Sequence, residues 1–198
     1  EALKKFIQCK KACNYLFKGK QLIVVNQDIA ALIHRHIKDT TVKVIHNGID
    51  FKRLKSHLVN KDDHLDKKWD TIFVGRLSEE KQPDVAIQAF AASGLTGRMA
   101  IVGDGPLLNE LVALTEKLQL TERIDFLGWQ TQPNQFIQQS HSLILSSRTE
   151  GFGLTIAEAL ILNVPAVAYN CSEGVEYQLS SGELSQGLVS LNDIDALS

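Results

Sequence analysis

Short runs of β-branched and other apolar residues alternate along the chain with longer helical patterns. The apolar runs predict strands at residues 22–25, 42–50, 71–75, 99–103, 124–128, 142–147, 164–169 and 187–191. The longer patterns predict helices at residues 3–17, 28–37, 83–92, 106–118, 134–139 and within 150–160, with another helix starting as the chain ends. Asp28 is the expected N-cap of the second helix.

The predicted strands are apolar enough to be buried on both faces, which is typical of a parallel sheet with helices on each side. Right-handed crossovers then give a doubly wound, Rossmann-like α/β domain. Sheets of this kind bind ligands at the carboxyl ends of their strands. Motifs that carry chemistry are therefore expected directly after strands.

The domain organisation follows from where the regular alternation begins. Residues 51–198 form the expected α/β domain, truncated at its C-terminus, and residues 1–50 hold too few elements for a core of their own. We expect residues 1–50 to be the end of an upstream domain, with a hinge near residues 47–50 and a charged segment at 52–68. The chain begins with Glu1, and its single methionine is internal, so we expect a piece of a larger protein.

Composition narrows the class of protein. A formal net charge of −2 argues against a nucleic-acid partner, which would call for a basic face. No apolar run reaches the length of about 18 residues that suggests a membrane-spanning helix. Cys9, Cys13 and Cys171 show neither disulfide nor zinc-site spacing, which favours reduced cytosolic thiols over a metal site.

The first candidate motif is VGRLSEEKQPD at residues 74–84. Arg76 and Lys81 lie in the connection after a strand, where a guanidinium and an ammonium suit a phosphate or diphosphate. The alternative is that they pair with Glu79 and Glu80 in a solvated loop. Composition alone leaves both interpretations open.

The second motif is VGDGPLL at residues 102–108, whose Gly103 and Gly105 suggest a dinucleotide fingerprint. The third glycine of that fingerprint is replaced by Leu108, and no acidic residue ends the following strand. NAD binding is therefore disfavoured. We interpret the motif as a tight turn that lets backbone approach a ligand closely.

The third motif is EGFGLTIAEAL at residues 150–160, in which two glycines precede a helix N-terminus that suits a phosphate or sugar hydroxyls. Thr155 and Glu158 also match a capping box. A glycosidase pair of Glu150 and Glu158 fits poorly, because the two would stand about 12 Å apart along a helix axis, whereas glycosidase carboxylates stand about 5–9.5 Å apart. That separation suits two hydroxyl clusters on one extended ligand.

Five stretches together resemble the retaining glycosyltransferases of family 4, which have the GT-B fold. In order they are HNGID (46–50), VGRLSEEK (74–81), VGDGP (102–106), FLGW (126–129) and SSRTEGFGLTIAEAL (146–160). The resemblance covers roughly residues 42–196. It implies that the chain is the C-terminal, nucleotide-sugar-binding domain, preceded by the last elements of the N-terminal domain.

The resemblance also implies a role for each matching residue. Arg76 and Lys81 would hold the donor diphosphate, Glu158 would bind the ribose hydroxyls, and Glu150 would face the transferred sugar. Glu150, Arg76 and Lys81 make up the implied catalytic set. The remaining implied donor-binding residues are Gly75, Gly105, Pro106, Phe126, Leu127, Gly128, Gly151, Phe152, Gly153 and Leu154. The family needs neither metal nor cofactor, because the two cations replace a divalent ion.

The implied function is transfer of a hexose or N-acetylhexosamine from a nucleotide-sugar, with UDP favoured, to a glycan or lipid-linked acceptor in bacterial lipopolysaccharide, O-antigen or capsule synthesis. We expect a cytoplasmic location, with peripheral membrane contact through the first helix as one interpretation and a solvated face as the other. That helix carries Lys4, Lys5, Lys10, Lys11 and Lys18. Alternatives are a GT-B nucleotide-sugar epimerase and a non-catalytic nucleotide-binding module. This piece alone is expected to bind nucleotide without transferring sugar, because the missing N-terminal domain supplies the acceptor site.

Overall fold

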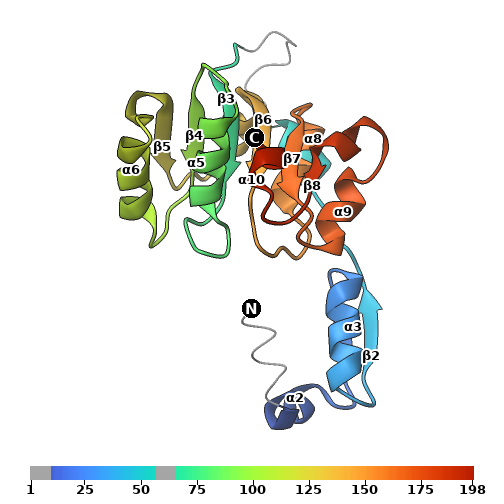
Figure 1. The fold of residues 1–198 in the computed structure, drawn as a ribbon. Helices are drawn as coiled ribbons and strands as arrows, with labels where there is room; N and C mark the ends of the chain where they lie inside the picture. The colour runs from blue at the N-terminus through green and yellow to red at the C-terminus, as the bar shows by residue number, and fades with distance from the viewer. Residues whose placement is uncertain (1–9, 57–65) are drawn as a thin grey trace.

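The computed structural model describes residues 10–56 and 66–198, and its main body is a six-stranded parallel sheet flanked by helices (Figure 1). The strands of this sheet are β3 (Trp69–Val74), β4 (Met99–Val102), β5 (Ile124–Gly128), β6 (Ser140–Leu145), β7 (Ala166–Tyr169) and β8 (Leu188–Val189). Its helices are α4 (Phe51–Ser56), α5 (Pro83–Ala92), α6 (Leu108–Lys117), α7 (Asn134–Gln138), α8 (Leu154–Ile161), α9 (Glu173–Leu179) and α10 (Ile194–Leu197), with short 3-10 turns at η1 (Thr121–Arg123) and η2 (Gly182–Gly187).

Alternate residues of the central strands point into two separate hydrophobic cores. In β6, Leu143 and Leu145 join one core and Ile144 joins the other. The first core is closed by α4, α7, α8 and α9, and the second by α5, α6 and α10. Figure 1 shows α5 and α10 across the near face of the sheet. Apolar residues are thus needed at consecutive strand positions, and the predicted doubly wound α/β fold is confirmed.

The order of the strands fixes where a ligand can bind. The sheet runs β5-β4-β3-β6-β7-β8, and all neighbouring strands are parallel. The chain winds outward from β3 to β5 and then returns to place β6 on the other side of β3. Connections therefore leave the carboxyl ends of β3 and β6 in opposite directions, which opens a crevice between them.

Two glycines of the VGDGP turn let the loops after β3 and β4 touch. Gly103 has a φ of +141°, and a Cβ added there would lie 1.9 Å from the carbonyl oxygen of Gly75. A Cβ on Gly105 would lie 2.3 Å from the carbonyl oxygen of Leu77. The backbone that approaches these glycines is therefore the neighbouring loop, held by the Leu77 amide donating to the Asp104 carbonyl at 3.0 Å.

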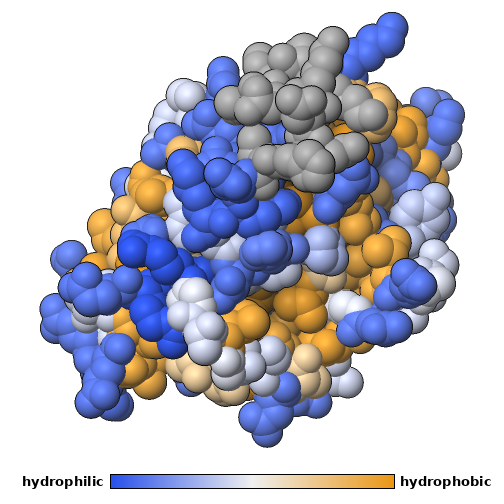
Figure 2. All heavy atoms as spheres, turned by 90° about the horizontal axis from the view of Figure 1, so that it is seen from above, coloured by the Kyte–Doolittle hydropathy of each residue, from blue (hydrophilic) through white to orange (hydrophobic). Residues whose placement is uncertain are grey.

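At the opposite end of the sheet, where the strands begin, the Asp125 side chain links two strands. Its carboxylate accepts a hydrogen bond from the Trp69 indole at 2.7 Å and pairs with the Arg98 guanidinium. Figure 2 shows the molecule from this end, where hydrophilic side chains cover much of the surface and hydrophobic ones lie between them. These contacts connect β3 to β5 and stand apart from the crevice at the carboxyl ends.

The residues before the hinge form a small separate unit below the sheet in Figure 1. It contains α2 (Lys10–Phe17), β1 (Gln21–Val24), α3 (Gln27–His36) and β2 (Thr41–Val44), with β1 and β2 parallel. Its buried core is Cys13, Val24, Ala30, Ile33 and Ile37. The N-cap of α3 is Asn26, whose side chain accepts from the Ile29 amide at 2.9 Å, and not Asp28 as predicted.

One further prediction about an element was wrong, and two helices were not predicted. The strand predicted over 42–50 ends at residue 44, because the HNGID segment turns away from the two-stranded sheet. The charged segment at 52–68 contains part of α4, and residues 57–65 lie outside the described part. The segment after Tyr169 contains α9, whose N-cap Ser172 accepts from the Val175 amide at 3.4 Å. Its glycine at the second helical position obscured this helix signal.

The predicted lysine face of the first helix lies partly outside the described residues. Residues 4 and 5 precede the described part of the chain, and Lys18 is exposed with its ammonium 4.0 Å from Asp39. Across residues 10–56 and 66–198, no helix has the length and apolar character that crossing a membrane requires.

Gly103→Ala should destabilise the chain strongly. The added Cβ would overlap the Gly75 carbonyl, so we expect the free energy of unfolding to fall by about 3 kcal/mol or more. Urea denaturation measures this change. Gly182→Ala is the control: its φ is also positive, at +59°, but nothing lies within 4 Å, so it should cost only about 1–2 kcal/mol. Equal losses in the two variants would contradict close packing of the loops.

Candidate functional site

The loop after β6 is fastened to the loop after β3. The buried Ser146 hydroxyl donates to the Gln82 carbonyl at 2.7 Å, and the Arg148 amide donates to the Glu80 carbonyl at 2.9 Å. These bonds span the crevice at the switch point of the sheet. They hold Lys81, in the first loop, opposite Glu150, in the second.

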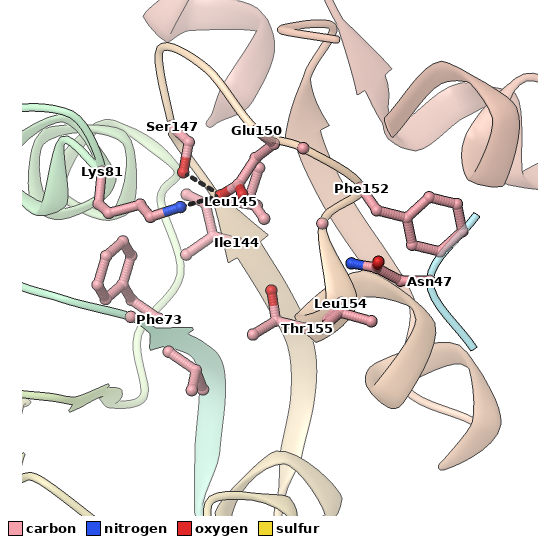
Figure 3. A pocket seen from close by; sticks show the side chains of 14 residues that line it. Asn47, Phe73, Lys81, Ile144, Leu145, Ser147, Glu150, Phe152, Leu154 and Thr155 are labelled. Carbon is pink, nitrogen blue, oxygen red and sulfur yellow. Dashed lines mark hydrogen bonds and ion pairs between the residues drawn. The ribbon is translucent and has the colours of Figure 1, made fainter. Parts of the chain in front are cut away.

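Lys81 and Glu150 meet at the mouth of a cavity of 280 Å³ (Figure 3). The ammonium lies 2.7 Å from a Glu150 carboxylate oxygen, which also accepts from the Ser147 hydroxyl at 2.8 Å. The side chains are 26% exposed for Lys81 and 13% exposed for Glu150. The Lys81 ammonium and the Glu150 carboxylate are thus partly desolvated at one point, where they can contact a polar ligand strongly.

The glycine turn that follows, residues 151–153, leads into α8 and lines the same cavity with unpaired amides. Gly153 adopts a φ of +77° and is the N-cap of α8, with no side-chain cap bond. The capping box considered for Thr155 and Glu158 is therefore not formed. Among the described residues, the amides of positions 151–155 donate to no carbonyl or side chain. Residues 151–155 all line the cavity, so the N-terminus of α8, with N–H groups that have no acceptor among the described residues, lies beside it.

Glu158 lies one turn further along α8, in a neighbouring cavity of 490 Å³. Gly48, Ile49 and Asp50 line this cavity, and Leu154 lines both it and the first one. Burial raises the pKa of the Glu158 carboxyl above its usual range. Among residues 10–56 and 66–198, no salt bridge to this carboxylate is found, which suits a ligand that offers hydroxyl groups.

Arg76 occupies a different place from Lys81. It is exposed and lines a cavity of 450 Å³ with Gly75 and Trp129, and another of 540 Å³ with Pro106. Gly75 also lines the cavity of Lys81, so the spaces adjoin along the β3 loop.

The remaining predicted donor-binding residues do not line the cavity of Lys81. Gly105 packs on the β3 loop, and Phe126, Leu127 and Gly128 form the end of β5. Phe126 packs against one core and Leu127 against the other. The exposed Trp129, one residue beyond, lines the cavity of Arg76 instead.

Several cavity residues escaped prediction from the sequence. Ser147 ends the strand predicted over 142–147, so its position at the carboxyl end of a strand was a usable signal. Asn47 lies in the quoted HNGID stretch and lines the cavity of Lys81. Cys171 stands near Glu150, and burial followed by that negative charge raises the pKa of its thiol to about 12, so it is no nucleophile at neutral pH. No cluster of three or more metal-ligating side chains was found within the described residues.

The sequence profile of the family described as glycosyl transferases group 1 matches residues 55–198. An uncharacterised glycosyltransferase of Methanocaldococcus jannaschii is 31% identical over 177 residues, which cover 82% of this chain and 43% of that protein. The lipopolysaccharide 1,6-galactosyltransferase of Salmonella typhimurium is 27% identical over 157 residues, which cover 76% of this chain and 43% of that protein. The chain thus spans less than half the length of these two relatives.

Solved structures share the fold. The HepE protein of Anabaena, crystallised in complex with UDP and glucose, superimposes with a TM-score of 0.72 and 22% identity, covering 88% of this chain and 50% of that one. The likeness places the doubly wound sheet among GT-B glycosyltransferase domains, as the resemblance in sequence implied.

Glu158→Gln should stabilise the ligand-free chain in a pH-dependent way. Because the folded pKa is raised, the folded state holds the Glu158 proton more tightly than the unfolded state. The native chain therefore loses stability as pH rises from the ordinary glutamate range through the raised pKa. The neutral amide avoids that loss, so the advantage of the variant in Tm should grow from pH 4 to pH 8. The exposed Glu116→Gln should show no such trend, and a constant difference for Glu158→Gln would contradict a desolvated carboxyl.

Proposed function

The chain belongs to the glycosyl transferases group 1 family, and on that premise we propose that it is the donor-binding part of a retaining transferase of family 4 type. The donor is a nucleotide-sugar, with UDP as the carrier, and the transferred group is a hexose or N-acetylhexosamine. The acceptor is a glycan or lipid-linked glycan of bacterial lipopolysaccharide, O-antigen or capsule, and relatives named as such transferases support this class. The transfer needs no metal ion. It takes place in the cytoplasm, with peripheral contact of the protein at the inner face of the membrane.

One observation carries the proposal. A row of free amides at positions 151–155 and the Lys81 ammonium face one cavity at the switch point of the sheet. Both kinds of donor are suited to phosphate oxygens. Because they converge from separate loops, they would contact a diphosphate from two sides.

The residues around this anion site could contact each part of a nucleotide-sugar donor. The Arg76 guanidinium, one cavity further along the β3 loop, would add a second cation to the diphosphate. Glu158 would accept hydrogen bonds from the ribose hydroxyls in the cavity beside the hinge. Glu150 would face the transferred sugar, next to the amides of Gly151 and Phe152.

The proposed chemical step breaks the bond between the sugar and the β-phosphate. Negative charge grows on the leaving phosphate, where Lys81, Arg76 and the α8 N-terminus would stabilise it. The acceptor hydroxyl attacks the sugar from the face that the phosphate leaves and passes its proton to the leaving phosphate oxygen, which retains the configuration of the sugar. The acceptor would bind against the rest of the N-terminal domain, so this chain alone should bind nucleotide without transferring sugar. Sugar transfer by the purified 198-residue chain would contradict that division.

Calorimetric titration tests the proposed function directly. We expect the chain to bind one of UDP, GDP and ADP in preference to the others, with the same affinity before and after EDTA is added. Affinity that disappears with EDTA would contradict a metal-independent site, and failure of all three nucleotides to bind would contradict the donor site.

Lys81→Met should weaken UDP binding by about 10- to 100-fold, which is the value of one charge-assisted hydrogen bond. Uridine, which lacks phosphate, should bind the variant and the parent equally. Lys117→Met, which removes an exposed lysine from the end of α6, is the matched control and should bind UDP like the parent. An unchanged UDP affinity in Lys81→Met would remove Lys81 from the phosphate site.

A further inference from the structure

Two carboxamide side chains donate hydrogen bonds to carbonyl groups of the glycine turn, residues 151–153. The Asn26 Nδ2 donates to the Gly151 carbonyl at 2.6 Å. The Gln178 Nε2 donates to the Phe152 carbonyl and lies 3.5 Å from the Gly153 carbonyl. The Gly153 carbonyl also accepts from the Ile156 amide at 3.0 Å, so all three successive carbonyls have donors within the protein. The amides of residues 151–155 have no acceptor among the described residues.

The orientation of each carboxamide is fixed by its other contacts. The Asn26 Oδ1 accepts from the Ile29 amide at 2.9 Å as the cap of α3, so only the Nδ2 can face Gly151. The Gln178 Nε2 also donates to the Gly174 carbonyl at 2.9 Å, whereas its Oε1 is buried without a partner. Rotating the Gln178 amide would direct an oxygen at carbonyl oxygens, so its unpartnered Oε1 is the cost of holding the turn.

The two side chains come from different units of the molecule. Gln178 is on α9, which can lie against the turn because Gly174 has no Cβ. A Cβ at that position would stand only 2.6 Å from the Gly151 carbonyl oxygen. Asn26 belongs to the small N-terminal unit and is 1% exposed. It contacts Gly151 across 125 residues of sequence.

The neighbours of Asn26 secure this contact between the units. The Gln27 amide, at the start of α3, donates to the Glu173 carboxylate. In return, the Glu173 amide, at the start of α9, donates to the Asp28 carboxylate at 3.1 Å. Each helix start is thus capped by an acidic side chain of the other unit, which favours a fixed position of α3 against α9.

We propose that Asn26 and Gln178 are positioning residues for the donor site, and that the N-terminal unit completes that site through Asn26. They fix the turn so that its amides, and not its carbonyls, face the diphosphate. Released from Asn26, the Gly151 peptide can rotate and present its oxygen to the phosphate, which repels it. This inference rests on the proposed function, since it assigns the turn to a nucleoside diphosphate.

Asn26→Ser and Asn26→Asp separate the two tasks of this side chain. Serine and aspartate are both good N-caps, so α3 should stay capped while the donor to Gly151 is lost. Gln21→Glu, at an exposed position in the same unit, is the control for the added negative charge of the aspartate. Calorimetry of each chain with uridine, UMP and UDP then shows which part of the ligand senses the change.

We expect both Asn26 variants to bind UDP at least about 5-fold more weakly, the loss of one hydrogen bond, and uridine within 2-fold of the parent. Gln21→Glu should match the parent with all three ligands. Losses that are equal for uridine and UDP would indicate general damage and overturn the positioning role. A parent that binds UDP and variants that bind it equally well would overturn this inference while leaving the proposed function standing.

A measurement without ligand tests the contact itself. The carbonyl carbon of Gly151 should change its NMR chemical shift in Asn26→Ser, because it loses a hydrogen bond, while that of Phe73 in β3 should not. An unchanged Gly151 signal would overturn the inference whatever the nucleotide data show. A parent that binds no nucleotide would contradict the proposed function and, with it, the positioning role.

Discussion

The reversal of winding between β3 and β6 is the constraint from which the site follows. Because the connections leave these two strands in opposite directions, their carboxyl ends face an open crevice, and loops from both sides must meet across it. Hydrogen bonds from the Ser146 hydroxyl and the Arg148 amide bring these loops together. The positions of Lys81 and Glu150 depend on that meeting, since they are far apart in sequence and 2.7 Å apart in space.

The electrostatics of the site are arranged for an anion that carries a sugar. Lys81 is paired with Glu150 in the ligand-free chain, which keeps a partly buried carboxylate from standing uncompensated. The free amides of the α8 N-terminus lie in the same cavity and have no anion of their own among the described residues. A diphosphate would share Lys81 with Glu150 and satisfy those amides, so one ligand would complete two sets of contacts. The desolvated Glu158 carboxyl lies in the next cavity, where we propose that it binds hydroxyl groups of the ligand.

The main body of the fold could be predicted from the sequence because strands buried on both faces leave continuous apolar runs, as LILS and FVG do here. Motifs after those strands located Lys81, Glu150 and Glu158, since the carboxyl ends of parallel strands share one edge. The second helix cap was misplaced by two residues because Asn26 and Asp28 are both good caps, and only tertiary contact decides between them. Asn26 and Gln178 could not be assigned to the glycine turn, because a bond from a side chain to a distant backbone carbonyl has no local pattern. Phe126, and not Trp129, was predicted to bind the donor. The ring of Phe126 packs against the core, whereas Trp129 lines the cavity of Arg76.

The central claim is that the amides of the glycine turn receive the phosphates of a nucleotide. An amide-resolved NMR titration of the chain with UDP tests it most directly. We expect the signals of residues 151–155 to shift together with that of Lys81 and to saturate at one common affinity. Saturable binding of UDP in which residues 151–155 keep their shifts, while signals elsewhere move, would place the phosphates at another site and contradict this assignment.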